Sequence, residues 1–154
     1  MMKLITAVRG LVLAITSSLA WLPPLLARVA VGWVFVDAGW HKLGDLGRVV
    51  EAFRKMGIGW PEFQGPLVAY CEFICGVLLL AGLLTRVAVV PLIITMVVAL
   101  TTAHRAQITG IPDLFGMSQF LYIVLLVWLG TAGAGPISID WALARQLKSA
   151  GAQK

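Results

Sequence analysis

Residues 63–85 read FQGPLVAYCEFICGVLLLAGLLT, an apolar stretch with a single charged side chain, Glu72. A second stretch, residues 87–103, reads VAVVPLIITMVVALTTA and contains no charge. Each approaches the roughly 20 apolar residues that a helix needs to cross a bilayer. Residues 82–86 leave so little chain between the two stretches that we expect a tight antiparallel helical hairpin, with Thr85 as a candidate N-cap.

The composition predicts an integral membrane protein. Hydrophobic residues make up 60% of the 154 residues, charged residues only 12%, and the mean hydropathy is +0.93. Water-soluble domains have about 25% charged residues, so the composition excludes a soluble enzyme. The net charge is +5, but no basic run exceeds two residues and the charges lie between apolar stretches, as in loops beside a membrane. We therefore expect a lipid bilayer, and not nucleic acid, as the partner of this chain.

The predicted fold class is all-α, an integral membrane bundle of four transmembrane helices in a single domain over residues 1–154. The spans are expected at about residues 24–42, 64–83, 86–104 and 115–133. Pro91 falls in the first turns of the third span, where it can kink the helix without ending it. A short tail helix is expected over residues 140–150, capped by Asp140.

The first 22 residues imitate a signal peptide, but their apolar side chains recur at helical spacing. These are Leu4, Ile5, Val8, Leu11, Val12, Ile15, Leu19 and Leu22. The run before Pro23 and Pro24 is too short to cross a bilayer comfortably. We expect an amphipathic helix over residues 1–22 that lies in the membrane interface and is stopped by the two prolines. A fifth span is the alternative.

A second surface helix is expected between the first two spans. Its apolar face consists of Leu46, Val49, Val50 and Phe53. Charged side chains take the opposite face, which is typical of an amphipathic helix. Asp45 can cap its start, and Gly57 with Gly59 can end it. This helix should lie on the membrane or over the mouth of the bundle.

The distribution of basic residues predicts the orientation. With four spans, one side of the membrane holds seven basic residues, Lys3, Arg9, Arg28, Arg86, Arg145, Lys148 and Lys154. The other side holds five, Lys42, Arg48, Arg54, Lys55 and Arg105. Because cytoplasmic loops carry the excess of Lys and Arg, we expect both termini in the cytoplasm.

Six landmarks, taken in order along the chain, resemble the DoxX family. They are residues 26–32 (LARVAVG), residues 39–43 (GWHKL), Glu72, residues 82–86 (GLLTR), His104 and residues 135–140 (GPISID). The resemblance covers residues 25–145. It implies a small four-helix protein of the bacterial inner membrane, similar to the small subunit of thiosulfate:quinone oxidoreductase and to members found with redox, thiol or metal-handling partners. Cys71 and Cys75 lie outside the family pattern, and the loop after His104 matches it less closely.

Charged residues inside spans are candidates for function, because each costs about 2.5–3.5 kcal/mol at a helix centre. For Arg28 and Arg86 two interpretations are open: they form ion pairs or bind a ligand inside the bundle, or they snorkel from helix ends to the surface. Glu72 is too short to snorkel far. We expect it to pair with a cation inside the bundle, either Lys42 or His41.

Asp37 and His41 lie four residues apart on one helix and therefore share a face. A carboxylate there would orient the imidazole for proton exchange with a quinone carbonyl or a thiol. The alternative is an interfacial belt of Trp and His at the end of a span. Asp37, His41 and Glu72 are the catalytic candidates. The expected outward-facing cluster consists of His41, Lys42, Glu72 and His104.

Cys71 and Cys75 flank Glu72 and lie four residues apart on the second span. They do not form a CxxC motif, and cysteines on successive turns of one helix are poorly placed for a disulfide. As thiolates they could bind a soft ion such as Cu(I), helped by Met56 or Met96. The alternative is that they pack as small hydrophobic side chains.

Three hypotheses for function remain open. The first is an accessory or anchoring subunit of a redox system, with a quinone or a small thiol in the outward-facing cluster and other membrane or redox subunits as partners. The second is a small transporter or copper-handling protein, with Cys71, Glu72 and Cys75 along its pathway. The third is a structural subunit of a larger respiratory or assembly complex.

Overall fold

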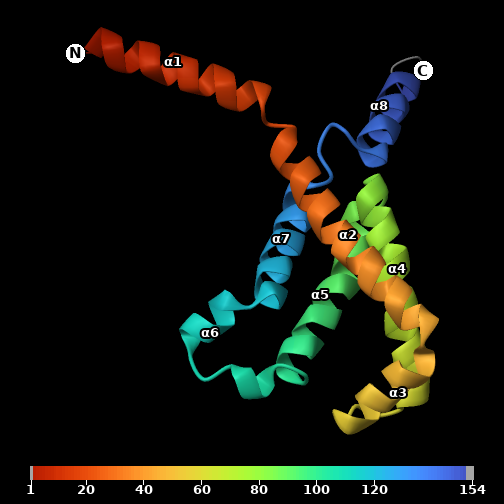
Figure 1. Ribbon diagram of the computed structural model, residues 1–154. Helices are drawn as coiled ribbons and strands as arrows, with labels where there is room; N and C mark the ends of the chain where they lie inside the picture. The colour runs from red at the N-terminus through yellow and green to blue at the C-terminus, as the bar shows by residue number, and fades with distance from the viewer. Residues whose placement is uncertain (1, 152–154) are drawn as a thin grey trace.

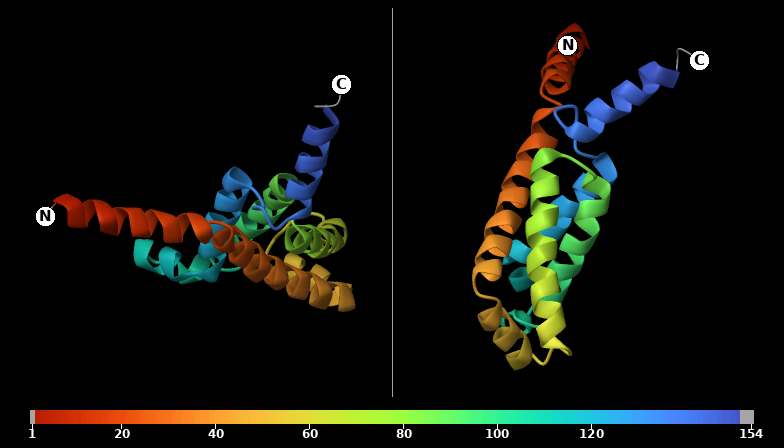
Figure 2. Two further views of the ribbon diagram at one scale, coloured as in Figure 1. Left: turned by 90° about the horizontal axis from the view of Figure 1, so that it is seen from above. Right: turned by 90° about the vertical axis from the view of Figure 1, so that its right-hand side faces the viewer.

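The computed structural model describes residues 2–151, and its regular elements there are helical. The helices are α1 Met2–Ser18, α2 Leu22–Gly44, α3 Leu46–Lys55, α4 Pro61–Ala81, α5 Thr85–Thr101, α6 Ile111–Gly116, α7 Ser118–Ala132 and α8 Ile139–Gly151, with a 3-10 turn η1 at Arg105–Gln107. Helices α2, α4, α5 and α7 lie alongside one another as a bundle (Figure 1). Helices α1 and α8 project from one end of this bundle (Figure 2).

Two of these helices are long and apolar enough to cross a bilayer, α2 with 23 residues and α4 with 21. The third and fourth predicted spans correspond to α5 and α7, which are apolar but only 17 and 15 residues long. The fourth is shorter than predicted because the backbone turns extended at Met117, with ψ 133°, and leaves α6 as a separate helix. The structure confirms the all-α class, and the number of crossings stays a prediction.

The core lies between the four bundle helices and is apolar. Val31, Phe35, Leu79, Leu92 and Leu126 are fully buried there. Burial of side chains of this size stabilises a fold by roughly 1.5–3 kcal/mol each. The core therefore joins α2, α4, α5 and α7 into one unit.

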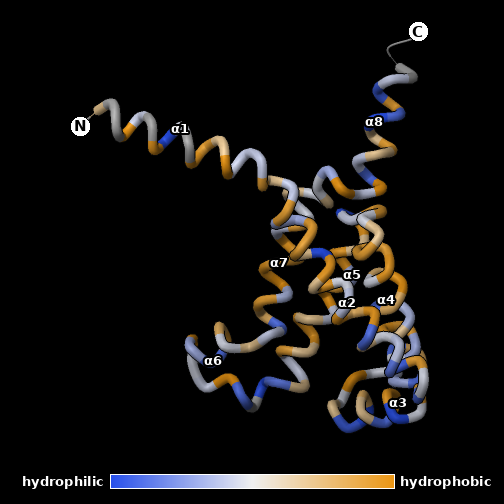
Figure 3. Tube along the Cα trace, turned by 45° about the horizontal axis from the view of Figure 1, so that its top comes forward, coloured by the Kyte–Doolittle hydropathy of each residue, from blue (hydrophilic) through white to orange (hydrophobic). Residues whose placement is uncertain are grey.

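The outer surface of the bundle is also apolar, as expected beside lipid. Trp33, Leu67, Val87, Ile94 and Leu121 are all exposed. A soluble protein rarely exposes contiguous apolar surface on this scale. Figure 3 shows hydrophobic residues along the bundle helices, whereas hydrophilic residues gather in α3, in the loop before α6 and in α8.

Helices α2 and α4 approach each other closely at glycines. A Cβ at Gly39 would lie 2.5 Å from the backbone nitrogen of Phe73, and one at Gly76 would lie 2.8 Å from that of Val36. Small residues at such positions allow helix backbones in a membrane to pack at short range. This contact fixes how the two longest helices lie against each other.

The prolines near the N-terminus lie at the start of the second helix, just after the first helix ends. Helix α1 ends at Ser18, and Pro23 and Pro24 lie in the first turn of α2, where a missing N–H leaves no helical hydrogen bond unmade. The first helix thus ends shortly before the two prolines, at Ser18 and not at the predicted residue 22. The described side chains of α1 are exposed. Met1 and Lys154 lie outside the described residues, as do the side chains of Lys3, Leu4 and Leu11.

Asp140 does not cap the tail helix as predicted. The Oγ of Ser138 takes that role and accepts from the backbone N–H of Trp141 at 3.1 Å. The carboxylate of Asp140 instead accepts from the N–H groups of Leu84 at 2.7 Å and Thr85 at 3.0 Å. Leu84, with φ 49°, occupies the N-cap position predicted for Thr85. A carboxylate far along the chain thus caps α5, where the helix dipole favours negative charge.

Helix α3 forms where the amphipathic pattern predicted it. The Oδ1 of Asp45 accepts from the N–H of Arg48 at 3.0 Å, which caps the helix start. The helix ends at Lys55, and Gly57 follows with φ 72°. It packs against α4 at the end of the bundle where α2 finishes (Figure 1).

The glycine contact between α2 and α4 yields a stability prediction. Gly39→Ala should lower the free energy of unfolding by about 1–3 kcal/mol, the usual cost of overpacking, because the new methyl group meets the backbone of Phe73. Gly44→Ala is the matched control, since a Cβ there meets nothing within 4 Å. Denaturation in detergent, followed by near-UV circular dichroism, measures both. Equal stability of the two variants would contradict the close contact.

Candidate functional site

A buried ion pair joins α2 and α4. The Nζ of Lys42, near the end of α2, donates a hydrogen bond to the Oε2 of Glu72 on α4. The Glu72 side chain is 2% exposed and that of Lys42 is 33% exposed. The structure thus gives Glu72 the cation that its position requires, and of the two expected partners the cation is Lys42. Because the ammonium reaches open space, the pair is accessible from one side.

The pair faces a cavity of about 620 Å³ between α3, α4 and α5. Apolar side chains of all three helices make most of its wall, including Val49, Phe53, Met56, Leu67, Val68, Ile94, Met96 and Val98. Its polar lining comes from His41, Lys42, Asp45, Arg48, Gln64, Glu72, Thr95 and Thr102. Ligand sites typically combine an apolar wall with a few convergent polar groups in a volume of about 300–1,000 Å³. We call this space the Glu72 cavity.

His41 lies in the wall of the Glu72 cavity, and its ring is oriented by its own helix. Its Nδ1 lies 2.9 Å from the backbone carbonyl oxygen of Asp37 and 3.5 Å from the Asp37 Oδ1. Since a carbonyl oxygen can only accept, Nδ1 carries the hydrogen, and the Nε2 of a neutral ring is left as an acceptor. Asp37 and His41 therefore lie side by side as predicted, but His41 donates to the backbone carbonyl of Asp37 and not to its carboxylate. The His41 side chain is 74% exposed.

His104 does not line this cavity. Its Nδ1 lies 3.2 Å from the Oε1 of Gln107, and its Nε2 lies 2.9 Å from the Nε2 of Gln119. An Nδ1–H that donates to Gln107 and an Nε2 that accepts from the Gln119 amide satisfy both contacts. The ring thus ties the loop after α5 to α7. Of the expected cluster, the structure brings together His41, Lys42 and Glu72 and leaves His104 apart.

Arg28 and Arg86 lie at the other end of the bundle. Arg28 is 5% exposed, and its guanidinium donates to the carbonyl oxygens of Ala134 and Ile137 in the loop after α7. Arg86 donates to the carbonyl of Thr131 at 3.4 Å. Arg86 thus binds the last turn of α7, where the helix dipole favours cations, whereas Arg28 binds the loop that follows α7. Of the two interpretations, snorkelling does not describe Arg28, which is buried against the chain.

The two cysteines contribute to packing. Cys75 is buried in the core beside Val31 and Leu79, and Cys71 packs against the same core. Neither lines the Glu72 cavity. Among residues 2–151 there is no group of three or more His, Cys, Asp or Glu side chains arranged to hold a metal ion. The copper and transport hypotheses stay predictions.

Sequence reasoning missed the apolar wall of the cavity. Phe53 of α3, Met56 directly after α3 and Thr95 of α5 line it, yet only the apolar face of α3 was visible as a pattern. An apolar face must be buried against another apolar surface. For this helix the two expected positions were the membrane and the mouth of the bundle. The contribution of α5 carried no signal, since its residues are apolar on every side.

Comparisons with known proteins identify the family. The family model described as DoxX matches residues 24–105. The chain belongs to the DoxX family. The matched segment contains Arg28, Asp37, His41, Lys42, and Glu72, so the Glu72 cavity lies in the part of the chain that defines this DoxX protein.

Three relatives of this DoxX protein are known by name. The membrane protein Rv3486 of Mycobacterium tuberculosis is 34% identical, over 85% of this chain and 88% of its own length. The inner membrane protein YqjF of Escherichia coli is 31% identical, over 75% and 88%. A Bacillus subtilis protein named "Putative oxidoreductase CatD" is 29% identical, over 75% and 83%. No solved structure matches the chain. This chain is thus a DoxX membrane protein, as the resemblance of its motifs implied.

Because Glu72 is buried, we expect loss of its lysine partner to cost more unfolding free energy than loss of the lysine in an exposed Lys–Glu pair. Lys42→Met leaves a buried carboxylate without its cation and should cost about 3 kcal/mol of unfolding free energy. Lys55→Met is the control, because its pair with Glu51, at 3.2 Å, is exposed and such pairs contribute about 0–1 kcal/mol. The double variant Lys42→Met/Glu72→Leu should recover most of the loss. Chemical denaturation in detergent measures all three. If the double variant were no more stable than Lys42→Met, the claim that Lys42 compensates the buried charge of Glu72 would be contradicted.

Proposed function

We propose that this DoxX protein is the quinone-binding membrane subunit of a redox system, with the quinone ring in the Glu72 cavity. The observation that carries the proposal is a buried Lys42–Glu72 pair facing an apolar cavity of about 620 Å³. A quinone ring is flat and apolar with carbonyl acceptors at its edge. It therefore matches a space with mostly apolar walls and a donor among its lining residues.

Lys42 and Glu72 would act on different atoms of such a ligand. The ammonium of Lys42 donates to a quinone carbonyl, which withdraws electron density from the ring. The Oε1 of Glu72 has no hydrogen-bond partner among the described residues. It is free to accept from a quinol hydroxyl or, when protonated, to donate to a carbonyl. Reduction of a quinone to a quinol takes two electrons and two protons. The partner oxidoreductase supplies the electrons, and this chain supplies the binding site and a proton route.

His41 lines the same cavity as the pair, and its side chain is 74% exposed. Its Nε2 is available to accept. An imidazole can accept a proton at one ring nitrogen and release one from the other. His41 would therefore pass protons between the surrounding water and the cavity. The CatD relative carries the name of an oxidoreductase, which agrees with redox chemistry in the family and assigns no substrate.

The helix arrangement supports four crossings of a bacterial inner membrane. Helix α5 runs back beside α4 after a turn of residues 82–84, so if α4 crosses the membrane, α5 returns across it. At 1.5 Å per residue, α5 and α7 span about 25 and 22 Å, which a locally thinned bilayer accommodates. Both termini lie at one end of the bundle (Figure 1), as an even number of crossings requires. Helix α1 would then lie in the interface beside that end.

A binding experiment tests the quinone site. Ubiquinone-1 titrated into the purified protein in nanodiscs should bind and quench tryptophan fluorescence. Lys42→Met and Glu72→Gln should each weaken binding about tenfold or more, since a hydrogen bond to a charged group contributes about 1.5–3 kcal/mol. Lys55→Met and Glu51→Gln remove a chemically identical pair outside the cavity and should leave affinity unchanged. Absence of binding, or equal affinities in both pairs of variants, would overturn the proposal.

A fusion experiment tests the topology. Basic residues favour the side of the termini, seven against five, which predicts cytoplasmic ends. Alkaline phosphatase is active only outside the cytoplasm and green fluorescent protein fluoresces only inside it. We expect a C-terminal fusion to give fluorescence and no phosphatase activity. The same fusions placed after Gly59, in the opposite loop, serve as the control and should give the reverse.

A further inference from the structure

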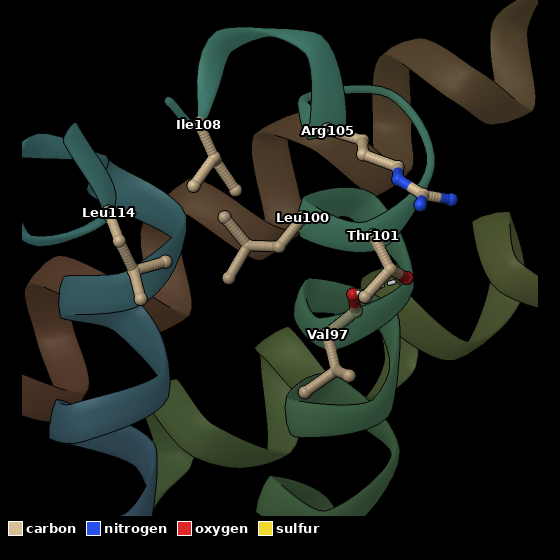
Figure 4. A pocket seen from close by; sticks show the side chains of 6 residues that line it. All are labelled: Val97, Leu100, Thr101, Arg105, Ile108 and Leu114. Carbon is tan, nitrogen blue, oxygen red and sulfur yellow. Dashed lines mark hydrogen bonds between the residues drawn. The ribbon is translucent and has the colours of Figure 1, made fainter. Parts of the chain in front are cut away.

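A second hollow lies away from the Glu72 cavity, beside the chain that links α5 to α7. It has a volume of about 440 Å³ and is lined by Val97, Leu100, Thr101, Arg105, Ile108 and Leu114. Figure 1 shows the reason for it, because α6 swings outward from the bundle before α7 returns. In Figure 4 the side chains of Leu100, Ile108 and Leu114 point toward one another across this space. We call it the Arg105 hollow.

The interior of the Arg105 hollow offers no polar group to a ligand. Four of its six side chains are aliphatic, and the hydroxyl of Thr101 is already bonded to the carbonyl of Val97 at 2.9 Å. Apolar walls of this kind offer an ordered water few hydrogen-bond partners. On the outer face of a membrane protein, the apolar material available to fill it is a lipid acyl chain.

Arg105 supplies a charge at the rim. Its guanidinium points away from the apolar side chains (Figure 4) and makes no hydrogen bond or ion pair among the described residues. A free guanidinium matches the oxygens of a phosphate in a two-point contact. Arg105 is the first residue of η1, shortly after α5 ends at Thr101, so it would lie at the membrane surface if α5 crosses the bilayer.

Asp113, the acidic residue closest to Arg105 in sequence, forms no ion pair with it. The Oδ2 of Asp113 accepts from the Thr109 hydroxyl at 2.6 Å, from the Thr109 N–H at 3.0 Å and from the Gly110 N–H at 3.1 Å. These bonds, with the Thr109 hydroxyl first among them, hold the pKa of Asp113 below its usual value. They also fasten the start of α6, so the wall that carries Leu114 is held in place.

We propose that the Arg105 hollow binds an anionic phospholipid, with one acyl chain among Leu100, Ile108 and Leu114 and the phosphate on Arg105. Apolar contacts hold the chain, and the guanidinium selects lipids of negative charge. Basic residues beside membrane helices recognise anionic headgroups in this way. The site is separate from the Glu72 cavity and is independent of any quinone.

Native mass spectrometry of the purified protein tests this site. With equal amounts of phosphatidylglycerol and phosphatidylcholine of identical chains, we expect phosphatidylglycerol to be retained preferentially. Arg105→Gln should lower that preference about fivefold, as expected for one basic residue at a lipid surface. Lys148→Gln removes an exposed charge on α8 and is the matched control, with no change expected.

A second variant tests the chain contact. Ile108→Trp fills the hollow and should reduce retention of phosphatidylglycerol without removing charge, whereas glycerol phosphate, a headgroup without chains, should not compete. Equal retention of both lipids by the unmodified protein would overturn the proposal. So would equal effects of Arg105→Gln and Lys148→Gln, which indicate non-specific attraction, or competition by glycerol phosphate, which indicates an anion site without a lipid chain.

Discussion

The close backbone contact between α2 and α4 determines where the charges of the bundle lie. Gly39 meets the backbone of Phe73, and Gly76 meets that of Val36. Two contacts along the pair fix both the separation of the helices and their register. Lys42 follows Gly39 by less than one turn, and Glu72 directly precedes Phe73. The same packing that joins the helices therefore sets the ammonium against the carboxylate. A bulkier interface would move the two charges apart and leave Glu72 buried alone.

The two ends of the bundle use buried charge differently. At the end that carries the termini, Arg28 is bonded to carbonyl groups of the loop after α7, and Asp140 caps α5. Those contacts are between parts of the chain and fasten the tail to the hairpin. At the other end, Lys42 is one-third exposed and lines a cavity. A charged group that borders a cavity can contact a ligand. A charged group that is surrounded by its own chain mainly stabilises the fold.

Some features of the fold and of the candidate site were predictable from the sequence, because they depend on local physical chemistry. The amphipathic face of residues 46–55 and the cost of an unpaired Glu72 depend on spacing and on one residue's surroundings, and the structure has a helix and a cation there. The cap from Asp140 and the partner of Arg28 depend on residues 55 or more positions apart. Hydropathy carries no information on such contacts. His104 shows the same limit: its side of the bundle was predictable, but not its bond to Gln119.

Helix α3 matters to the chemistry of the site as much as the two charges do. Its apolar residues Val49 and Phe53 line the Glu72 cavity, together with Met56 directly after the helix. Arg54 and Lys55 are exposed, and Arg54 donates to Glu62 of α4 at 2.6 Å. The helix thus covers Lys42 and Glu72 with apolar groups and is fastened at its far end. A hydrogen bond is stronger where water is excluded. The same pair in open water would discriminate little among ligands, so in the proposed site the amphipathic cover would allow one ammonium and one carboxylate to select an occupant.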